Sequence, residues 1–125
     1  MSAAFEKFIR GKIMRITQPS ISIRKNGTMG VNAVCVDKYF GECRYIEYYY
    51  DRDGKRIGLK PVKTKTEECY PVFFSKRSKS GTIAARKFFE YYGIDYKSGT
   101  KRYEVHWDDE NKFIVADLGK DLEGK

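Results

Sequence analysis

Short stretches in which apolar and polar residues alternate recur along the chain, and this period of two is typical of half-buried strands. The first covers residues 21–25, where Ile21 and Ile23 alternate with polar residues. Asn26 and Gly27 follow directly, and this pair is a strong signal for a hairpin turn. The pattern therefore predicts a hairpin whose return strand covers residues 28–31.

Apolar residues at helical spacing follow each of two such hairpins. Asn32 is placed to cap the first helix, and Gly41 is placed to end it in a left-handed conformation. The second helix has a wider apolar stripe and is followed by Gly93. The apolar positions of the two helices are Ala33, Val36 and Phe40, then Ala85, Phe88, Phe89 and Tyr92.

This order of elements occurs twice, which indicates an internal repeat. Residues 27–28 correspond to residues 81–82, and the later hairpin at 46–51 corresponds at a constant spacing to the one at 103–108. Gly54 and Asn111 occupy equivalent positions in the turns of these hairpins, and both residue types tolerate positive φ. We therefore predict a three-residue loop with a bulge in each hairpin, with positive φ at Gly54 and Asn111.

The aromatic residues at 45–50 divide between the two faces of one predicted strand. Tyr48 and Tyr50 share a face with Ile46, so we assign them to the core. Tyr45 and Tyr49 share the outer face and are candidates for contact with a partner, the alternative being an ordinary exposed sheet face or a subunit interface.

These patterns predict a single domain of mainly β structure with short helices, in the α+β class. Its expected parts are a basic N-terminal arm at 1–19, a first copy of the unit at 20–62 and a linker at 63–69. A second copy at 70–118 and a tail at 119–125 complete the chain.

Composition agrees with one folded domain and narrows its chemistry. The chain has 125 residues, of which 41% are hydrophobic, and no apolar run approaches the roughly 20 residues of a membrane span. Its first residues do not resemble a secretory signal, so we expect a cytoplasmic protein that does not enter membranes. Three cysteines without paired spacing and one histidine supply no zinc ligand set, so we expect buried thiols and no metal or cofactor.

The net charge of +8 favours a polyanionic partner. All of the excess positive charge lies within residues 1–66, whereas the remainder is balanced. Lys and Arg neutralise phosphates, and exposed aromatic rings can stack on unpaired bases. The candidate nucleic-acid-binding residues are Lys12, Arg15, Arg24, Lys25, Lys38, Lys76, Arg77, Lys79, Arg86 and Lys87. We expect the groups flanking Gly27 and Gly81 to lie near one another.

The repeated unit resembles the AbrB/SpoVT swapped-hairpin module of prokaryotic transcriptional regulators and antitoxins. The resemblance lies in a strand, a turn with glycine, a return strand, a short helix ending in an aromatic residue and glycine, and a hairpin containing Asp51 or Asp108. It implies that two tandem copies interleave into one small β-barrel, an intramolecular pseudo-dimer that binds DNA. The chain departs from the family at its basic contact positions, where Thr28 replaces the arginine and Lys38 is the only basic residue of the helix positions.

Catalysis is not expected, because His106 has no accompanying nucleophile pattern and the acidic residues 108–110 belong to a predicted turn. The leading interpretation is a nucleic-acid-binding protein, with a DNA-binding regulator of transcription preferred. One alternative is an RNA- or ribosome-associated factor. Another is a protein-interaction module, antitoxin-like or adaptor-like, that uses the face of Tyr45 and Tyr49 or a sheet edge. A homodimer is compatible with each.

Overall fold

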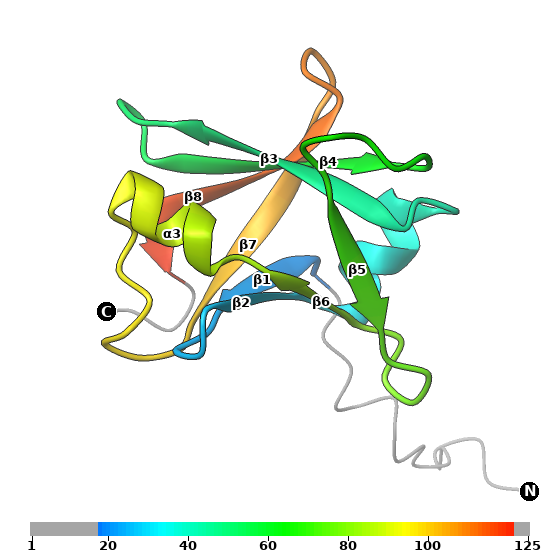
Figure 1. Cartoon of the computed structure of the whole chain (residues 1–125), viewed down its shortest axis with the longest axis horizontal. Helices are drawn as coiled ribbons and strands as arrows, with labels where there is room; N and C mark the ends of the chain where they lie inside the picture. Colours follow the sequence, from blue (N-terminus) through cyan, green and yellow to red (C-terminus); the bar gives the residue numbers. More distant parts are fainter. Residues whose placement is uncertain (1–17, 122–125) are drawn as a thin grey trace, which may run out of the picture.

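The structure is a computed structural model that describes residues 18–121. Eight antiparallel strands form a closed barrel, and short helical segments lie between strands of each half of the chain (Figure 1). The mainly β class predicted from the alternating pattern is confirmed. The strands are β1 (Ser20–Ile23), β2 (Thr28–Val31), β3 (Tyr45–Asp51), β4 (Arg56–Val62), β5 (Tyr70–Phe74), β6 (Gly81–Ala84), β7 (Lys101–Asp108) and β8 (Phe113–Asp121).

The order of strands around the barrel mixes the two halves of the chain. Around the closed sheet the strands follow the order β1, β2, β6, β5, β3, β4, β8 and β7. β1 pairs with β7 and β3 pairs with β5, so each half supplies neighbours to the other. Closure leaves no unpaired sheet edge among these strands, which removes the usual site of edge-to-edge association.

The helical segments begin and end where the sequence indicates. Asn32 caps α2 (Ala33–Cys35), because its Oδ1 accepts a hydrogen bond from the Cys35 amide at 2.9 Å. α2 continues into the π-helical turn η1 (Val36–Phe40), which Gly41 ends with φ of 52° and ψ of −119°. The positive φ agrees with the prediction, but the ψ puts Gly41 outside the left-handed helical region that the sequence predicts. α3 (Arg86–Tyr92) ends at Gly93, which has the left-handed conformation expected of a C-terminal glycine.

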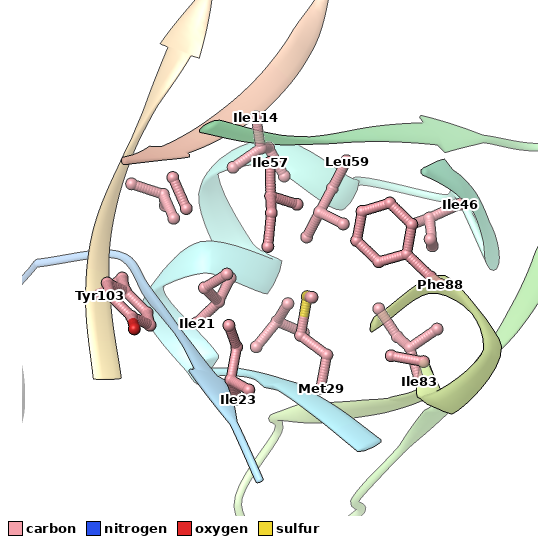
Figure 2. Close-up of a cluster of buried hydrophobic side chains, with 14 of the residues drawn as sticks. Ile21, Ile23, Met29, Ile46, Ile57, Leu59, Ile83, Phe88, Tyr103 and Ile114 are labelled. Carbon is pink, nitrogen blue, oxygen red and sulfur yellow. The ribbon is translucent and has the colours of Figure 1, made fainter. Parts of the chain in front are cut away.

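Side chains from all around the barrel fill its interior. Figure 2 shows Ile57, Leu59 and Ile114 facing Ile21 and Met29 across this core. These five side chains are at most 1% exposed. Burying an aliphatic side chain of this size contributes roughly 1.5–3 kcal/mol. Because these side chains come from strands that are distant in sequence, their burial stabilises the contact between those strands.

Tyr48 and Tyr50 belong to the edge of this core, as their position in the strand predicts. The Tyr48 ring stacks on Phe88 of α3 with centroids 4.4 Å apart, and its hydroxyl donates to the Ala84 carbonyl at 2.8 Å. Tyr50 contacts Tyr92 with centroids 4.7 Å apart. Burial raises the pKa of Tyr48 well above its usual value, with a smaller contribution from Tyr70. These contacts join β3 to α3.

The hairpin turns differ in one detail from the prediction. The residues with positive φ are Lys55 and Lys112, each one position after Gly54 and Asn111. Because Asp51 pairs with Arg56 and Asp108 pairs with Phe113, each loop contains four residues rather than three. The predicted positive φ at Gly54 and Asn111 is therefore wrong, although the two turns remain equivalent to each other. β8 also continues to Asp121, past the expected end of the second copy at 118.

Candidate nucleic-acid interface

The two basic turns lie at opposite ends of the ribbon formed by β1, β2, β6 and β5. Thr28, beside the first turn, pairs with Ala84, whereas Gly81, beside the second turn, pairs with Val31. Figure 1 shows the β1–β2 turn and the β5–β6 turn well separated. The expectation that these groups lie near one another is wrong, because β2 and β6 pair antiparallel and direct their turns away from each other.

Arg24 of the first turn lies across the outer face of the ribbon. Its Nη1 donates to Thr82 Oγ1 at 3.1 Å. The guanidinium occupies the space above Gly30, where the position of a Cβ would be only 2.2 Å from Nη2. Glycine within a strand marks a close approach of another group, and here that group is an arginine.

Arg86, the first residue of α3, lies against the same turn. Its Nη2 donates to the Asn26 carbonyl at 3.0 Å. A Cβ at Gly27 would be 3.0 Å from both Cβ and Nε of Arg86, and the φ of 86° at Gly27 also favours glycine. Gly27 therefore allows both the turn and the close packing of Arg86.

Arg102 of β7 adds a third guanidinium at this end of the barrel. It pairs in register with Ser22 of β1, and its Nε is buried without a hydrogen-bond partner among the described residues. Lys25 is exposed in the turn beside Arg24. A shallow hollow of about 330 Å³ lies here and is lined by Arg24, Lys25, Asn26 and Thr100. We call Arg24, Lys25, Arg86 and Arg102 the Arg24 cluster.

No carboxylate pairs with the Arg24 cluster within residues 18–121. The ion pairs in that range are Arg56 with Asp51 at 2.7 Å and Lys63 with Glu42 at 3.8 Å. The first pair joins the ends of β3 and β4, and the second joins the connection after β4 to the connection between η1 and β3. Hydrogen bonds fix Arg24 and Arg86 of the cluster, and no carboxylate neutralises any of its four cations in this range. Such a group attracts anions.

Lys101 lies beside this cluster but has an acidic neighbour. It pairs with Ile23 in register. The hydrogen bonds that Ser98 donates to the Asp95 carboxylate lower the pKa of Asp95, and the charge of Lys101 acts in the same direction with a smaller effect. We therefore leave Lys101 outside the cluster.

The other predicted basic residues are dispersed. Lys76, Arg77 and Lys79 are exposed in the β5–β6 turn, where the amide of Lys79 donates to the Ser75 carbonyl. Lys38 is exposed on η1 and Lys87 on α3. Lys12 and Arg15 lie outside the described residues.

Tyr45 and Tyr49 lie on β3, in a different part of the barrel from Arg24. Tyr49 is 43% exposed and packs against the Phe113 ring with centroids 5.1 Å apart. It lines a hollow of about 440 Å³ together with Asp51, Arg56 and Asp108. Tyr45 is half-buried and pairs with Val62 and Pro71.

Sequence reasoning missed three residues that shape this interface, namely Gly30, Arg102 and Phe73. Phe73 on the outer face of β5 is 67% exposed. For Gly30 the available signal was a glycine inside a predicted strand two residues before a helix cap. For Arg102 and Phe73 the signal was their outward phase in the alternation, but that phase does not tell which outward residues become neighbours.

The described residues contain no group of three or more His, Cys, Asp or Glu side chains that could hold a metal ion. Within the same range, no helix is long and apolar enough to cross a bilayer. His106 is exposed on the outer face of β7. No protein-family model, curated protein or solved structure matches the chain.

Proposed function

We propose that the chain is a nucleic-acid-binding protein without catalytic activity, which binds phosphates through the Arg24 cluster. The observation that carries this proposal is the set of three guanidinium groups of Arg24, Arg86 and Arg102, none of which has a carboxylate partner in the described residues. Hydrogen bonds to Thr82 and to the Asn26 carbonyl fix the first two of them. Arginine donates several hydrogen bonds in a planar arrangement that suits phosphate oxygens. The net charge of +8 adds a long-range attraction to the same partner.

We further propose that the barrel is a tandem form of the AbrB-like swapped hairpin. Two features of the strand pairing support it. β1 of the first half pairs with β7 of the second, and β5 of the second half pairs with β3 of the first. Met29 also pairs with Ile83, and Gly58 pairs with Val115. The residue pairs Met29–Ile83 and Gly58–Val115 each join residues that are equivalent in the internal sequence alignment. Such pairs are expected where an axis of approximate two-fold symmetry passes between two strands.

This architecture favours DNA as the partner and regulation of transcription as the role. Under the approximate two-fold axis, the β1–β2 turn and the β5–β6 turn are related positions at the two ends of one ribbon. Lys76, Arg77 and Lys79 would then provide a second, weaker set of phosphate contacts. A long nucleic acid that lies along the ribbon could meet both turns.

The experiment measures binding of labelled DNA of mixed sequence, as a duplex and as a single strand, by fluorescence anisotropy at low and high salt. We expect affinity to fall steeply with salt, since each phosphate contact releases about one counterion. The double variant R24Q/R86Q should bind more weakly and with a shallower salt slope than the native protein. Lys63→Gln, which removes an exposed lysine paired with Glu42, is the matched control and should leave the slope nearly unchanged.

Absence of binding to both forms of DNA and to RNA would overturn the proposal. Binding that does not respond to salt would overturn it as well. Tighter binding of structured RNA than of DNA in a competition assay would favour the RNA- or ribosome-associated alternative.

A second candidate function is protein binding through the outer face of β3, β4 and β8. The observation that favours it is the contact of exposed Tyr49 with half-buried Phe113 beside the 440 Å³ hollow. Retention of one protein partner after nuclease treatment, and its loss in Tyr49→Ala, would support this candidate. A second copy of the chain as that partner would appear as a dimer in sedimentation.

A further inference from the structure

The outer face of the barrel carries a row of register partners that crosses five strands. Arg102 of β7 pairs with Ser22 of β1, and Ser22 pairs with Gly30 of β2. Gly30 pairs with Thr82 of β6, and Thr82 pairs with Phe73 of β5. With strands about 4.8 Å apart, the row spans roughly 19 Å from Arg102 to Phe73. The three residues between its ends have small side chains or none, so they project little from the surface of the sheet between Arg102 and Phe73.

Arg24 covers the middle of this row. Its guanidinium lies above Gly30 and is fixed by the hydrogen bond to Thr82. Thr82 is the direct neighbour of Phe73, so the planar guanidinium and the phenyl ring are on adjoining positions of one face. The row thus has cations at one end and in the middle, and an aromatic ring at the other end.

Among the phenylalanines that the structure describes, Phe73 alone is exposed. It is 67% exposed, while Val72 beside it in sequence is buried. Neither a ring contact nor a cation contact involves Phe73 within residues 18–121, whereas the aromatic residues near α3 pack against one another. Both faces of an aromatic ring are apolar surfaces on which a nucleobase can stack, irrespective of sequence.

We propose that this row binds single-stranded nucleic acid, with an unpaired base stacked on Phe73 and the neighbouring phosphates held by Arg24 and Arg102. The proposal rests on the proposed nucleic-acid binding and narrows it to the unpaired form. Bases in a duplex are stacked on each other, so only a single strand can offer a base to Phe73. Arg102 suits the role because its side chain is only partly buried and no carboxylate pairs with it within the described residues.

The experiment uses the full chain and a labelled oligonucleotide of about 12 nucleotides, within the range that small β-barrels bind. Four probes of equal length separate the effects of the sugar, of base pairing and of the bases themselves on binding. They are single-stranded DNA, single-stranded RNA of the same sequence, duplex DNA, and a DNA strand whose internal sugars lack bases. We expect the native protein to bind both single strands more tightly than the duplex. The relative affinity for the DNA and RNA strands then identifies which of them is the better ligand.

Phe73→Ala should weaken binding of the single strands by about tenfold, with no change in salt slope, because it removes a stacking surface and no charge. Phe73→Leu should lose nearly as much, whereas Phe73→Trp should retain binding. None of the three should change binding of the abasic strand. Tyr91→Ala, which removes another strongly exposed aromatic residue at 73% exposure, is the matched control and should behave as the native protein. Thermal melting of each variant verifies folding.

Three results would overturn the inference while leaving the proposed function in place: a duplex bound at least as tightly as the single strands, native affinity in Phe73→Ala, or an equal loss on the abasic strand. Native affinity in Phe73→Leu would show an apolar contact rather than stacking, and would also overturn it. A protein that binds none of the probes would overturn both the inference and the proposed function.

Discussion

At two glycines of the first hairpin, an arginine side chain occupies the space that a Cβ would need. Gly30 leaves room for the Arg24 guanidinium, and Gly27 leaves room for Arg86. Gly81 differs, since a Cβ there would meet core atoms, namely Val72 Cγ1 at 2.8 Å and Val31 Cγ2 at 2.9 Å. The absence of a Cβ therefore makes room for a surface arginine at Gly27 and Gly30, and for core side chains at Gly81.

Gly30→Ala and Gly81→Ala should separate these two roles. The alanine at 30 displaces only the end of a flexible arginine, so we expect weaker nucleic-acid binding with a change in the free energy of unfolding below about 1 kcal/mol. The alanine at 81 overpacks the core and should destabilise by about 1–3 kcal/mol. Urea denaturation and anisotropy titration measure the two effects. A large loss of stability in Gly30→Ala would contradict the surface role of that glycine.

Cys35 is fully buried in α2, and burial raises the pKa of its thiol to about 12. Alkylating reagents react with the thiolate, so iodoacetamide at pH 8 should leave Cys35 unmodified in the native protein and modify it in urea. Peptide mass mapping identifies the modified cysteines. Cys43 and Cys69, which are half-buried, serve as internal comparisons. Modification of native Cys35 as fast as Cys43 would show that this side chain is accessible.

At the scale of elements, the hairpin turns β3–β4 and β7–β8 share one backbone design. Asp51 accepts a hydrogen bond from the Gly54 amide, and Asp108 accepts the equivalent bond from Asn111. The Gly54 amide, with Arg56 next in importance, lowers the pKa of the Asp51 carboxyl group. At Asp108 the Asn111 side chain has the largest effect and the Asn111 amide the next, and both lower the pKa of that carboxyl group. The aspartate fixes the start of each turn, and the left-handed residue then falls on the fourth loop position.

Lys55→Gly and Lys112→Gly should each stabilise the protein. A residue with a Cβ pays roughly 1–2 kcal/mol for the left-handed conformation, whereas glycine adopts it freely but loses more backbone entropy on folding. We expect a net gain of about 0.5–1 kcal/mol in the free energy of unfolding, measured by urea denaturation. Gly54→Ala, one position earlier, is a comparison in which no such gain is expected. Destabilisation by both glycine substitutions would contradict the left-handed conformation at these lysines.

At the scale of the whole molecule, the halves of the chain depend on each other. β1 of the first half pairs with β7 of the second half, and β5 of the second half pairs with β3 of the first. Tyr48 of the first half also packs on Phe88 of the second. A half expressed alone would expose both strand edges and the apolar face that the other half covers.

We therefore expect fragments 1–62 and 63–125 to be unfolded separately and to fold when mixed. Circular dichroism and dispersion of amide resonances measure folding of each fragment and of the equimolar mixture. A fragment that folds as a monomer by itself would contradict the interleaved pairing. A folded homodimer of one fragment would agree with it, because two equal copies could then exchange hairpins.

Much of the local structure could be predicted from the sequence, because local rules govern it. Alternation at Ile21 and Ile23, the pair Asn26 and Gly27, and the Asn32 cap depend on interactions between residues close in the chain. The assignment of Tyr48 to the core followed from the same alternation. The sequence-based prediction misplaced the residue with positive φ. Glycine and asparagine only favour that conformation, whereas the length of the loop determines which residue must adopt it.

The amino-acid order by itself determined the mainly β class, the two helical segments and the set of outward-facing cations. Only the tertiary structure decided which of those cations share a surface. Strand alternation fixes the face of a residue but not its cross-strand neighbour, and that neighbour depends on long-range register. The antiparallel pairing of β2 with β6 thus separated the two basic turns, and it placed Arg24 between Arg102 and Phe73.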